Sequence, residues 1–439
     1  MTRTSLTRRN LLRAAGATAL TAGAAGLTSC AAPLTGTGSG RQLAYWNFFT
    51  GGDGERMVEL VDAYRGEAPD VDVTDTTLMW GSPYYTKLAM ACAGGRAPDL
   101  ATMHLSRLPP FAAHLLDPFD LDELAARGIT REQFPARVWD QSLVDGELYA
   151  LPLDTHPMVL YVNTDLCERA GLLGTDGALA PIASAEQFLD AGRRLAEVTG
   201  STGISWAAAA DGLAGWMLFW SVFRQLGGVM ELPQGGTAQV DRDAVVSAFS
   251  FLRDLTDGTI CSPTLDGPAA PAVFASQQAG LFVLGPWELI TAQSAQVPFT
   301  MTQFPALFGD EPLIRADSHS VVLPRHVSLD GQRRAAAYDM AASMLRNSLS
   351  WAGGGHIPAL SAVSESPEFL ALEPQSNYAG AAEFVEYDPD AYFSGSGSQL
   401  MSYGGQLILG VSTRAQTPEQ ATDALVSWLD QRLAIPSPV

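Results

Sequence analysis

The feature that most constrains the fold is an alternation of short apolar strands and amphipathic helices near the start of the chain. Residues 43–49 are apolar and aromatic and predict a buried strand, and apolar side chains then recur at helical spacing over residues 57–64. Residues 71–73 and 98–103 predict two more strands, separated by a helix over 84–93. Strands connected through helices pair in parallel, so this order predicts an α/β fold.

The alternation continues to the end of the chain. Ser184 with Gln187, and Thr417 with Gln420, have the spacing of capping boxes and predict two helix starts. Asp241 has the position of a cap for another helix. Further apolar strands are predicted at 279–284 and 320–323, and a helix at 334–346. No repeat with a period of 20–50 residues is visible, which excludes a solenoid.

Composition limits the class of protein. The chain has 439 residues, enough for two or three domains, and 47% are hydrophobic, enough for large cores. The formal net charge is -21. A surface this acidic repels phosphate backbones, so nucleic acid is excluded as a partner.

The first residues have the pattern of an export signal. Arg8 and Arg9 form a twin-arginine pair, and the uncharged stretch 14–27 that follows is shorter than the roughly 20 residues that a membrane span needs. Residues 27–30 resemble a lipobox that ends at Cys30. We therefore predict a signal peptide over 1–29, a lipid on Cys30 that holds the protein at the outer face of the cell membrane, and a flexible tether over 30–40. The alternative is an ordinary cleaved signal.

The other cysteines are Cys92, Cys167 and Cys261. An exported protein can form disulfides, and three thiols allow one bond with one thiol left over, in any pairing. None of these cysteines stands in a CxxC pair, and the sequence contains no HExxH, GxSxG or P-loop motif. No metal site and no cofactor are therefore predicted.

Aromatic and glycine-rich loops follow several of the predicted strands. They lie at 48–54, 79–81, 104, 285–287 and 353–356. In open α/β sheets, ligands bind beyond the carboxyl ends of the strands. One binding site assembled from many loops is therefore expected.

Six segments in a characteristic order carry a family resemblance. They are residues 45–54, Pro98-Asp99-Leu100, residues 145–152 with 161–163, residues 280–287 ending in Gly-Pro-Trp, residues 355–359, and residues 418–421. In this order they resemble a family-one extracellular solute-binding protein of the maltose-binding-protein-like group. The resemblance covers nearly the whole chain after the signal. It implies a two-lobe, type II periplasmic-binding-protein-like fold with the ligand cleft between the lobes.

The resemblance also implies a division of the chain and a function. The first lobe would hold residues 41–153 and 304–348, and the second 154–303 and 349–439. A monomer would capture a sugar or oligosaccharide by closing its lobes and would deliver it to the permease of an ABC importer. This function involves no catalysis.

Candidate ligand contacts follow from the loop positions and the resemblance. A sugar needs flat aromatics for its C–H face and planar polar groups for its hydroxyls. The candidates are Trp287, His356, Asp154, Trp46, Phe48, Gly51, Gly52, Asp53, Trp80, His104, Glu288, Gly355 and His319. The resemblance makes Trp287 the stacking platform, although a tryptophan in the core of a lobe would have the same sequence. Asp154 also fits a turn, Asp53 also fits a helix cap, and His356 also fits a surface loop.

Three other functions stay open at the level of sequence. The same fold binds other solutes, such as a polyamine or a metal chelate, and acidic residues would then dominate the site. An exported carbohydrate-active enzyme would need a pair of carboxylates, and the chain has many acids. A lipoprotein that has lost its importer would have the same landmarks.

Overall fold

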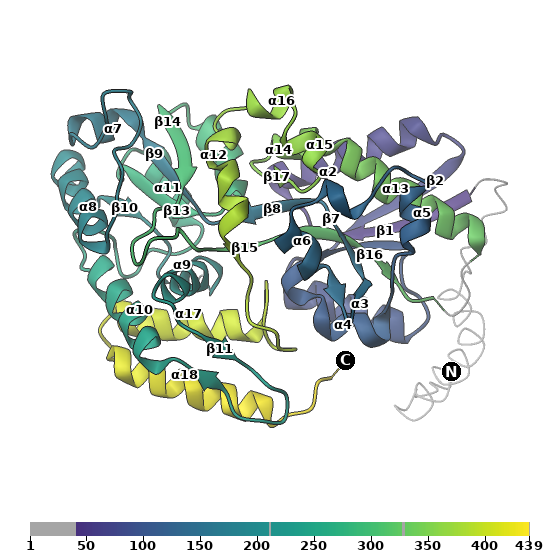
Figure 1. The fold of residues 1–439 in the computed structure, drawn as a ribbon. Helices are drawn as coiled ribbons and strands as arrows, with labels where there is room; N and C mark the ends of the chain where they lie inside the picture. The colour runs from purple at the N-terminus through teal and green to yellow at the C-terminus, as the bar shows by residue number, and fades with distance from the viewer. Residues whose placement is uncertain (1–40, 210–211, 327–329, 439) are drawn as a thin grey trace, which may run out of the picture. The chain divides into compact units, whose positions relative to one another are not determined.

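The computed structural model describes residues 41–209, 212–326 and 330–438. The predictions for the signal peptide, Cys30 and the tether lie outside these described residues. Within them, no helix is long and apolar enough to cross a membrane. The described residues pack around two separate hydrophobic cores, which define a first and a second lobe (Figure 1).

The first lobe contains a sheet with the order β2-β1-β3-β16-β4, and β7 pairs with β16. The strands are β1 (Arg41–Asn47), β2 (Val71–Thr77), β3 (Leu100–His104), β4 (Leu116–Asp117), β7 (Ala150–Pro152) and β16 (His319–Pro324). β1 pairs in parallel with β2 and β3, as the sequence predicts, whereas β16 is antiparallel to β3. The difference arises because β16 enters this sheet from the second lobe rather than through a helical crossover.

Helices and short strands complete the first lobe. They are α2 (Gly51–Glu67), α3 (Ser82–Ala93), η1 (Leu105–Arg107), α4 (Pro109–Leu115), α5 (Leu121–Ala125), η2 (Arg131–Gln133), α6 (Ala136–Gln141), β5 (Leu143–Val144), β6 (Glu147–Leu148) and α13 (Gly331–Arg346). The predicted apolar face of α2 is buried in the core. The cap expected from Asp53 is wrong, because Thr50 is the N-cap residue and Asp53 lies inside the first turn.

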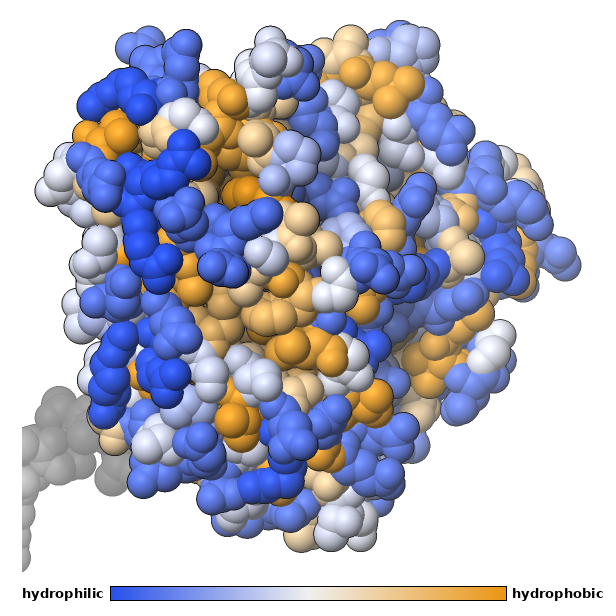
Figure 2. All heavy atoms as spheres, turned by 60° about the vertical axis from the view of Figure 1, so that its left-hand side comes forward, coloured by the Kyte–Doolittle hydropathy of each residue, from blue (hydrophilic) through white to orange (hydrophobic). Residues whose placement is uncertain are grey.

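The second lobe contains a sheet with the order β10-β13-β9-β14. Its strands are β9 (Val159–Asn163), β10 (Ile204–Ser205), β13 (Leu281–Leu284) and β14 (Phe299–Gln303), and a separate hairpin is formed by β11 (Met230–Glu231) and β12 (Gln239–Val240). Its helices are α7 (Thr164–Arg169), α8 (Ala185–Thr199), α9 (Gly212–Gln225), α10 (Arg242–Leu255), α11 (Ala269–Ala275), η3 (Pro286–Glu288), α12 (Leu289–Ser294), α17 (Gln399–Ser412) and α18 (Pro418–Leu433). Figure 2 views this side and shows hydrophilic residues over much of the surface, with smaller hydrophobic patches among them.

The predicted helix starts of the second lobe form with one difference. Thr417 and Gln420 make the complete capping box, and the Asp241 side chain caps α10. Ser184 caps α8, but the Gln187 side chain accepts from the N–H of Ala183 rather than from that of Ser184. The backbone N–H of Ala183 therefore takes the place of the Ser184 N–H as the donor to the Gln187 side chain.

A third sheet connects the lobes. Its order is β17-β8-β15-β18, with β8 (Asp154–Pro157), β15 (Ile314–Asp317), β17 (Ile357–Pro358) and β18 (Val385–Glu386). β8 leads from β7 to β9 and β15 leads from β14 to β16, so the chain passes between the lobes in this sheet (Figure 1). The remaining short elements near it are α14 (Ser348–Ala352), α15 (Ser361–Ser364), α16 (Pro367–Leu370) and η4 (Gln375–Phe384).

The cores show where the chain changes lobe. Phe304 and Ile314 pack in the second core, so the chain returns to the first lobe after β15, later than the expected residue 304. Leu360 and Val363 pack in the first core, beyond the expected boundary at 349. Among the described cysteines, all three are buried free thiols.

Candidate functional site

A cavity of about 360 Å³ lies between the two cores. The first lobe lines it with the residues after β1, the start of α2, Trp80, the end of β3 and the start of β16, and the second lobe lines it with α9, η3, α12 and the loop before α17. Strands β8 and β15 of the connecting sheet contribute His156 and Arg315. The lining side chains are Phe48, Phe49, Thr50, Gly51, Gly52, Asp53, Trp80, His104, His156, Leu213, Trp287, Glu288, Thr291, Arg315, His319 and Ser396. Its volume is within the range of small-molecule sites.

The structure brings most of the predicted contacts to this cavity. Those that line it are Phe48, Gly51, Gly52, Asp53, Trp80, His104, Trp287, Glu288 and His319. Asp154 and His356 are fully buried and do not line it. Gly355 packs against the backbone of Pro286 instead.

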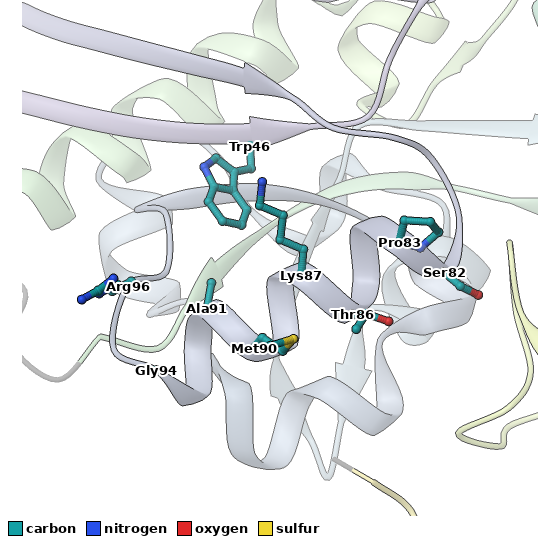
Figure 3. A pocket seen from close by; sticks show the side chains of 9 residues that line it. All are labelled: Trp46, Ser82, Pro83, Thr86, Lys87, Met90, Ala91, Gly94 and Arg96. Atoms are coloured by element: carbon teal, nitrogen blue, oxygen red, sulfur yellow. The ribbon is translucent and has the colours of Figure 1, made fainter. Parts of the chain in front are cut away.

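Trp46 lies in a different place. It lines an open surface hollow of about 750 Å³ beside α3, where the Lys87 Nζ atom is 5.4 Å from the centre of the indole ring (Figure 3). None of the other predicted contacts lines this hollow. Trp46 therefore does not join the other predicted contacts.

The position of Trp287 depends on a glycine. A Cβ atom built on Gly285 would lie 1.8 Å from the Trp287 ring, so only glycine allows the indole to fold back over the backbone at this point. The ring is partly buried and meets His156 edge-on, with ring centres 6.1 Å apart. Gly-Pro-Trp thus fixes an indole at the wall of the cavity.

The first lobe provides the opposing aromatic wall. Phe48 stacks on His104 with ring centres 4.9 Å apart and an interplanar angle of 3°. Trp80, whose residue is 39% exposed, approaches the same histidine edge-on. These flat surfaces offer apolar area to a ligand while leaving their edges to polar neighbours.

The start of α2 offers backbone donors. Gly51, Gly52 and Asp53 are its first three residues and all line the cavity. The first N–H groups of a helix have no intrahelical acceptor, so this end of the helix presents donors and partial positive charge to a ligand.

Asp154 is the centre of a buried polar cluster next to the cavity. Its Oδ1 atom accepts from the backbone N–H of His319 at 2.8 Å and lies 3.0 Å from His156 Nδ1. Its Oδ2 atom accepts from the indole N–H of Trp351 at 2.6 Å and lies 2.7 Å from His319 Nδ1. Burial alone would raise the pKa of Asp154, but the surrounding histidines and the hydrogen bond with His156 hold it well below its usual range. The carboxylate is therefore ionised.

His356 lies between two carboxylates. Its Nε2 atom is 3.0 Å from Asp53 Oδ1, and its Nδ1 atom is 3.3 Å from Asp154 Oδ2. Its ring stacks on Trp351, with centres 4.5 Å apart. Burial lowers the pKa of His356, but Asp53 and Asp154 outweigh it and raise the pKa overall.

Two of the histidines that line the cavity, His156 and His104, have their pKa shifted in the direction opposite to that of His356. Burial and the neighbouring His319 lower the pKa of His156 to about 4. Burial also holds the pKa of His104 well below its usual value, and the Tyr85 hydroxyl lies 2.7 Å from His104 Nδ1. Both imidazoles are therefore neutral near pH 7. A neutral imidazole has one donor and one acceptor, which suits a ligand hydroxyl.

Arg315 adds a buried charge to the cavity lining. Its Nη2 atom donates to Asp388 at 2.7 Å and to the Ser396 hydroxyl at 2.9 Å. Asp317 lies within the same network and accepts from the Ser106 hydroxyl. Burial opposes its ionisation, but His104 and Arg315 lower the pKa of Asp317.

The loop before α17 joins the second lobe to the first. The Ser396 N–H donates to the Ser106 hydroxyl at 3.0 Å, and Arg107 donates to the Ser394 carbonyl at 2.7 Å. Ser82 donates to the Gly397 carbonyl at 2.9 Å. These bonds connect the lobes at one side of the cavity.

Sequence reasoning missed several lining residues. They are Phe49, Thr50, His156, Leu213, Thr291, Arg315 and Ser396. His156 stands two residues after Asp154 on a strand whose alternation would have placed both on one face. Arg315 and Ser396 lie outside every recognisable motif, and only the assembled fold brings them to the cavity.

The structure also assembles possible metal ligands that the sequence did not indicate. Asp154, His156, His319 and His356 are all buried and each offers one ligand atom, and these atoms lie within 4.8 Å of one another. The four residues come from three distant segments, so no local spacing in the sequence indicates a metal site.

Comparison with known proteins identifies the family. The family model described as bacterial extracellular solute-binding protein matches residues 50–328. The arabinooligosaccharide-binding protein of Halalkalibacterium halodurans is 24% identical over 161 residues, which are 36% of this chain. The match spans about a third of that relative's length, 34%.

Solved structures show the same fold. The GacH receptor of Streptomyces glaucescens, described unliganded and with acarbose, has a TM-score of 0.74 at 18% identity, covering 90% of this chain and 98% of that one. Maltose-bound MalE3 of T. maritima has a TM-score of 0.74 at 17% identity, covering 88% and 98%. MalE of Bdellovibrio bacteriovorus, bound to maltotriose, has a TM-score of 0.70 at 17% identity, covering 90% and 100%. These matches confirm the predicted two-lobe α/β fold. Because the family model matches more than half of this chain, the chain belongs to the bacterial extracellular solute-binding proteins.

Proposed function

We propose that this protein binds a sugar or oligosaccharide in the cavity between its lobes and delivers it to the permease of an ABC importer. The observation that carries the proposal is the composition of the cavity wall. Aromatic faces from Phe48, Trp80 and Trp287 stand beside planar hydrogen-bonding groups such as Asp53 and Arg315. Sugars present an apolar face and a rim of hydroxyls, and this wall complements both. Of the similar proteins described above, one is named for arabino-oligosaccharides, and the others are described in complex with acarbose, maltose or maltotriose.

Capture by lobe closure is part of the proposal. The bonds from the 393–398 loop to Ser82, Ser106 and Arg107 are contacts that only close approach of the lobes can make. A solute that touches both walls of the cavity favours the arrangement in which these bonds form. It can shift the equilibrium only by its better contacts in that arrangement.

The site residues follow from this proposal. Trp287 would stack on the sugar, with Phe48 and Trp80 opposite, and Asp53, Glu288, His104 and His319 would bond its hydroxyls. Gly51 and Gly52 would donate from the backbone. Asp154 and His356 would act from behind the cavity wall by holding His319 and Asp53 in place.

The remaining parts of the proposal concern location and partners. Cys30 would carry the lipid that anchors a monomer to the outer face of the membrane, after export through the twin-arginine signal. The protein would release its ligand chemically unchanged, because its role is delivery. Each of these parts is open to a separate test.

A binding screen tests the proposed ligand class. The full-length protein is heated with maltose, maltotriose, acarbose or arabino-oligosaccharides, and in parallel with spermidine. A sugar that binds the folded state raises the unfolding midpoint, by an amount that grows with concentration. If spermidine stabilises the protein and no sugar does, the ligand is a polyamine rather than a sugar. Chromatography of the incubated sugars checks for turnover, and shortened products would make the protein an enzyme.

A further inference from the structure

We infer that Asp154, His156, His319 and His356 form a binding site for one divalent transition-metal ion, with zinc as the first candidate. The site lies where the connecting sheet meets the start of β16: His156 and His319 also line the solute cavity, whereas Asp154 and His356 lie behind its wall. The inference does not depend on which solute the cavity takes.

The density of ligands is the first observation. The chain has six histidines, and three of them meet around one carboxylate. All four side chains are buried, and the possible ligand atoms lie within 4.8 Å of one another. Imidazole nitrogens with one carboxylate are a donor set that zinc, copper, iron and nickel accept, and that calcium and magnesium do not favour.

An orphaned nitrogen is the second, independent observation. His356 is 0% exposed, and its Nδ1 atom is buried with no hydrogen-bond partner among the described residues. That atom lies 3.3 Å from Asp154 Oδ2, so it points into the cluster. An unpaired buried polar atom is unfavourable, and a bound cation would satisfy both the nitrogen lone pair and the carboxylate.

The distances suit a shared ion after a small contraction. His156 Nδ1 and His319 Nδ1 lie 3.0 Å and 2.7 Å from oxygens of Asp154. Zinc holds its nitrogen and oxygen ligands at about 2.0–2.2 Å, which separates ligand atoms in a tetrahedral site by roughly 3.3 Å. These two separations are already that short, and because all the possible ligand atoms lie within 4.8 Å of one another, the widest separation has to shorten by at most roughly 1.5 Å. Four protein ligands would leave no open position, as in structural zinc sites.

Residues around the cluster hold the ligands in orientation. Asp53 Oδ1 lies 3.0 Å from His356 Nε2, so a proton on that nitrogen leaves Nδ1 free to coordinate. The Trp351 indole donates to Asp154 at 2.6 Å. Ligating histidines commonly bond a carboxylate through the other ring nitrogen, and the loss of such a partner weakens metal binding by about 10- to 100-fold. Asp53 is thus a positioning residue for the metal.

The placement gives the ion a structural role. Asp154 and His156 belong to β8, His319 begins β16, and His356 precedes β17. The chain passes between the lobes in β8 and in β15, which ends just before His319, and β17 pairs with β8. One ion would therefore tie these three segments together. A bound metal would therefore stiffen the connection about which the lobes move.

Metal content of the full-length protein, produced without a polyhistidine tag, tests the inference. The protein is stripped with a chelator, incubated with ZnCl₂, passed through gel filtration and measured by mass spectrometry of the metal. We expect one zinc per chain and a higher unfolding midpoint for the loaded form. Cobalt in place of zinc should give the intense visible absorption of a four-coordinate ion. Retention of no zinc by the folded wild-type protein would overturn the inference and leave a proton as the occupant of the cluster.

Three variants make the test specific. His356→Gln keeps the volume of the side chain and should abolish stoichiometric zinc, and Asp53→Asn should weaken zinc affinity by about 10- to 100-fold. His114→Ala removes an exposed histidine outside the cluster and should bind zinc like the wild type. Zinc content equal in His356→Gln and wild type, with both folded by circular dichroism, would assign the bound metal to the surface. Sugar affinity, measured separately, distinguishes failure of this site from failure of the proposed function.

Discussion

Gly285 and Trp287 show how one backbone position sets the wall of the cavity. The indole occupies the space where any other residue at position 285 would place its Cβ atom, 1.8 Å from the ring. The backbone there has a φ of -78°, which every residue can adopt. Glycine is therefore required for the room it leaves rather than for its conformation.

Gly285→Ala should displace Trp287 and weaken sugar binding. The added methyl group cannot coexist with the ring, so the indole must turn away from its present position. If the indole is the stacking platform, affinity should fall at least about tenfold, or 1.4 kcal/mol. Isothermal titration with a sugar ligand measures this change.

Gly66→Ala is the matched control. Gly66 lies in α2, and a Cβ atom there would meet nothing within 4 Å. This substitution should leave affinity unchanged and slightly stabilise the helix, because alanine has the higher helix propensity. Equal affinities of Gly285→Ala and wild type would show that the present position of the indole is not needed for binding.

Residue-level prediction from sequence failed where burial decides the role. Asp154 and His356 were expected at the ligand because polar groups in crossover loops often face a cleft. The structure instead uses them as a buried pair behind the wall, with Asp154 meeting His319 and Trp351. The sequence does not show which loop residue will pair with a carboxylate from a distant segment of the chain.

At the scale of elements, the loop before α17 fastens one lobe to the other. Ser82, at the start of α3, donates to the Gly397 carbonyl at 2.9 Å, although the serine itself is exposed. A hydrogen bond of this kind contributes about 0.5–1.5 kcal/mol. If it forms only when the lobes close, that free energy adds to solute affinity rather than to the stability of either lobe.

Ser82→Ala should therefore reduce sugar affinity roughly 2- to 10-fold without lowering the unfolding midpoint of the sugar-free protein. Ser294→Ala is the control, because Ser294 is also exposed but its hydroxyl donates to the Ile290 carbonyl within the same helix, α12. Titration and thermal unfolding of both variants separate the two effects. A loss of stability without a loss of affinity would mean that the contact persists in the absence of sugar.

Elements with strong local patterns were predictable. The parallel strands β1, β2 and β3, the buried face of α2 and the capping box of α18 follow from period and cap chemistry that act within a few residues. The antiparallel placement of β16 was not predicted, because it depends on the chain returning from the other lobe. The Asp53 cap failed for a local reason, since α2 begins two residues earlier, at Gly51.

At the scale of the whole molecule, the family resemblance implied two lobes, and the two cores place the points of exchange between them at other residues than it implied. Residues such as Phe304 and Leu360 are apolar and would suit either core. Only the packing assigns Phe304 to the second lobe and Leu360 to the first lobe. The site forms only when the whole chain is folded, because α2, β8, η3 and the 393–398 loop meet only in the assembled fold.

Anchoring is a property of the whole molecule. Cys30→Ala should move the protein from the membrane fraction to the soluble fraction, because a lipid on that cysteine would be its attachment to the bilayer. Cys261→Ala is the control, since that thiol is buried and unpaired and should not affect fractionation. Immunoblotting of the two fractions measures the distribution. Membrane association that survives in Cys30→Ala would count against the lipid anchor.

The central claim is that sugar binds in the cavity between the lobes, and calorimetric titration of three proteins tests it most directly. Wild type, Trp287→Ala and Trp46→Ala are titrated with the sugar that stabilises the protein most. Trp287 lines the cavity and Trp46 lines the separate hollow beside α3. We predict saturable one-to-one binding by wild type and Trp46→Ala, and an affinity at least about tenfold weaker for Trp287→Ala, equivalent to 1.4 kcal/mol. Weaker binding by Trp46→Ala with unchanged binding by Trp287→Ala would contradict the claim and place the ligand in the hollow.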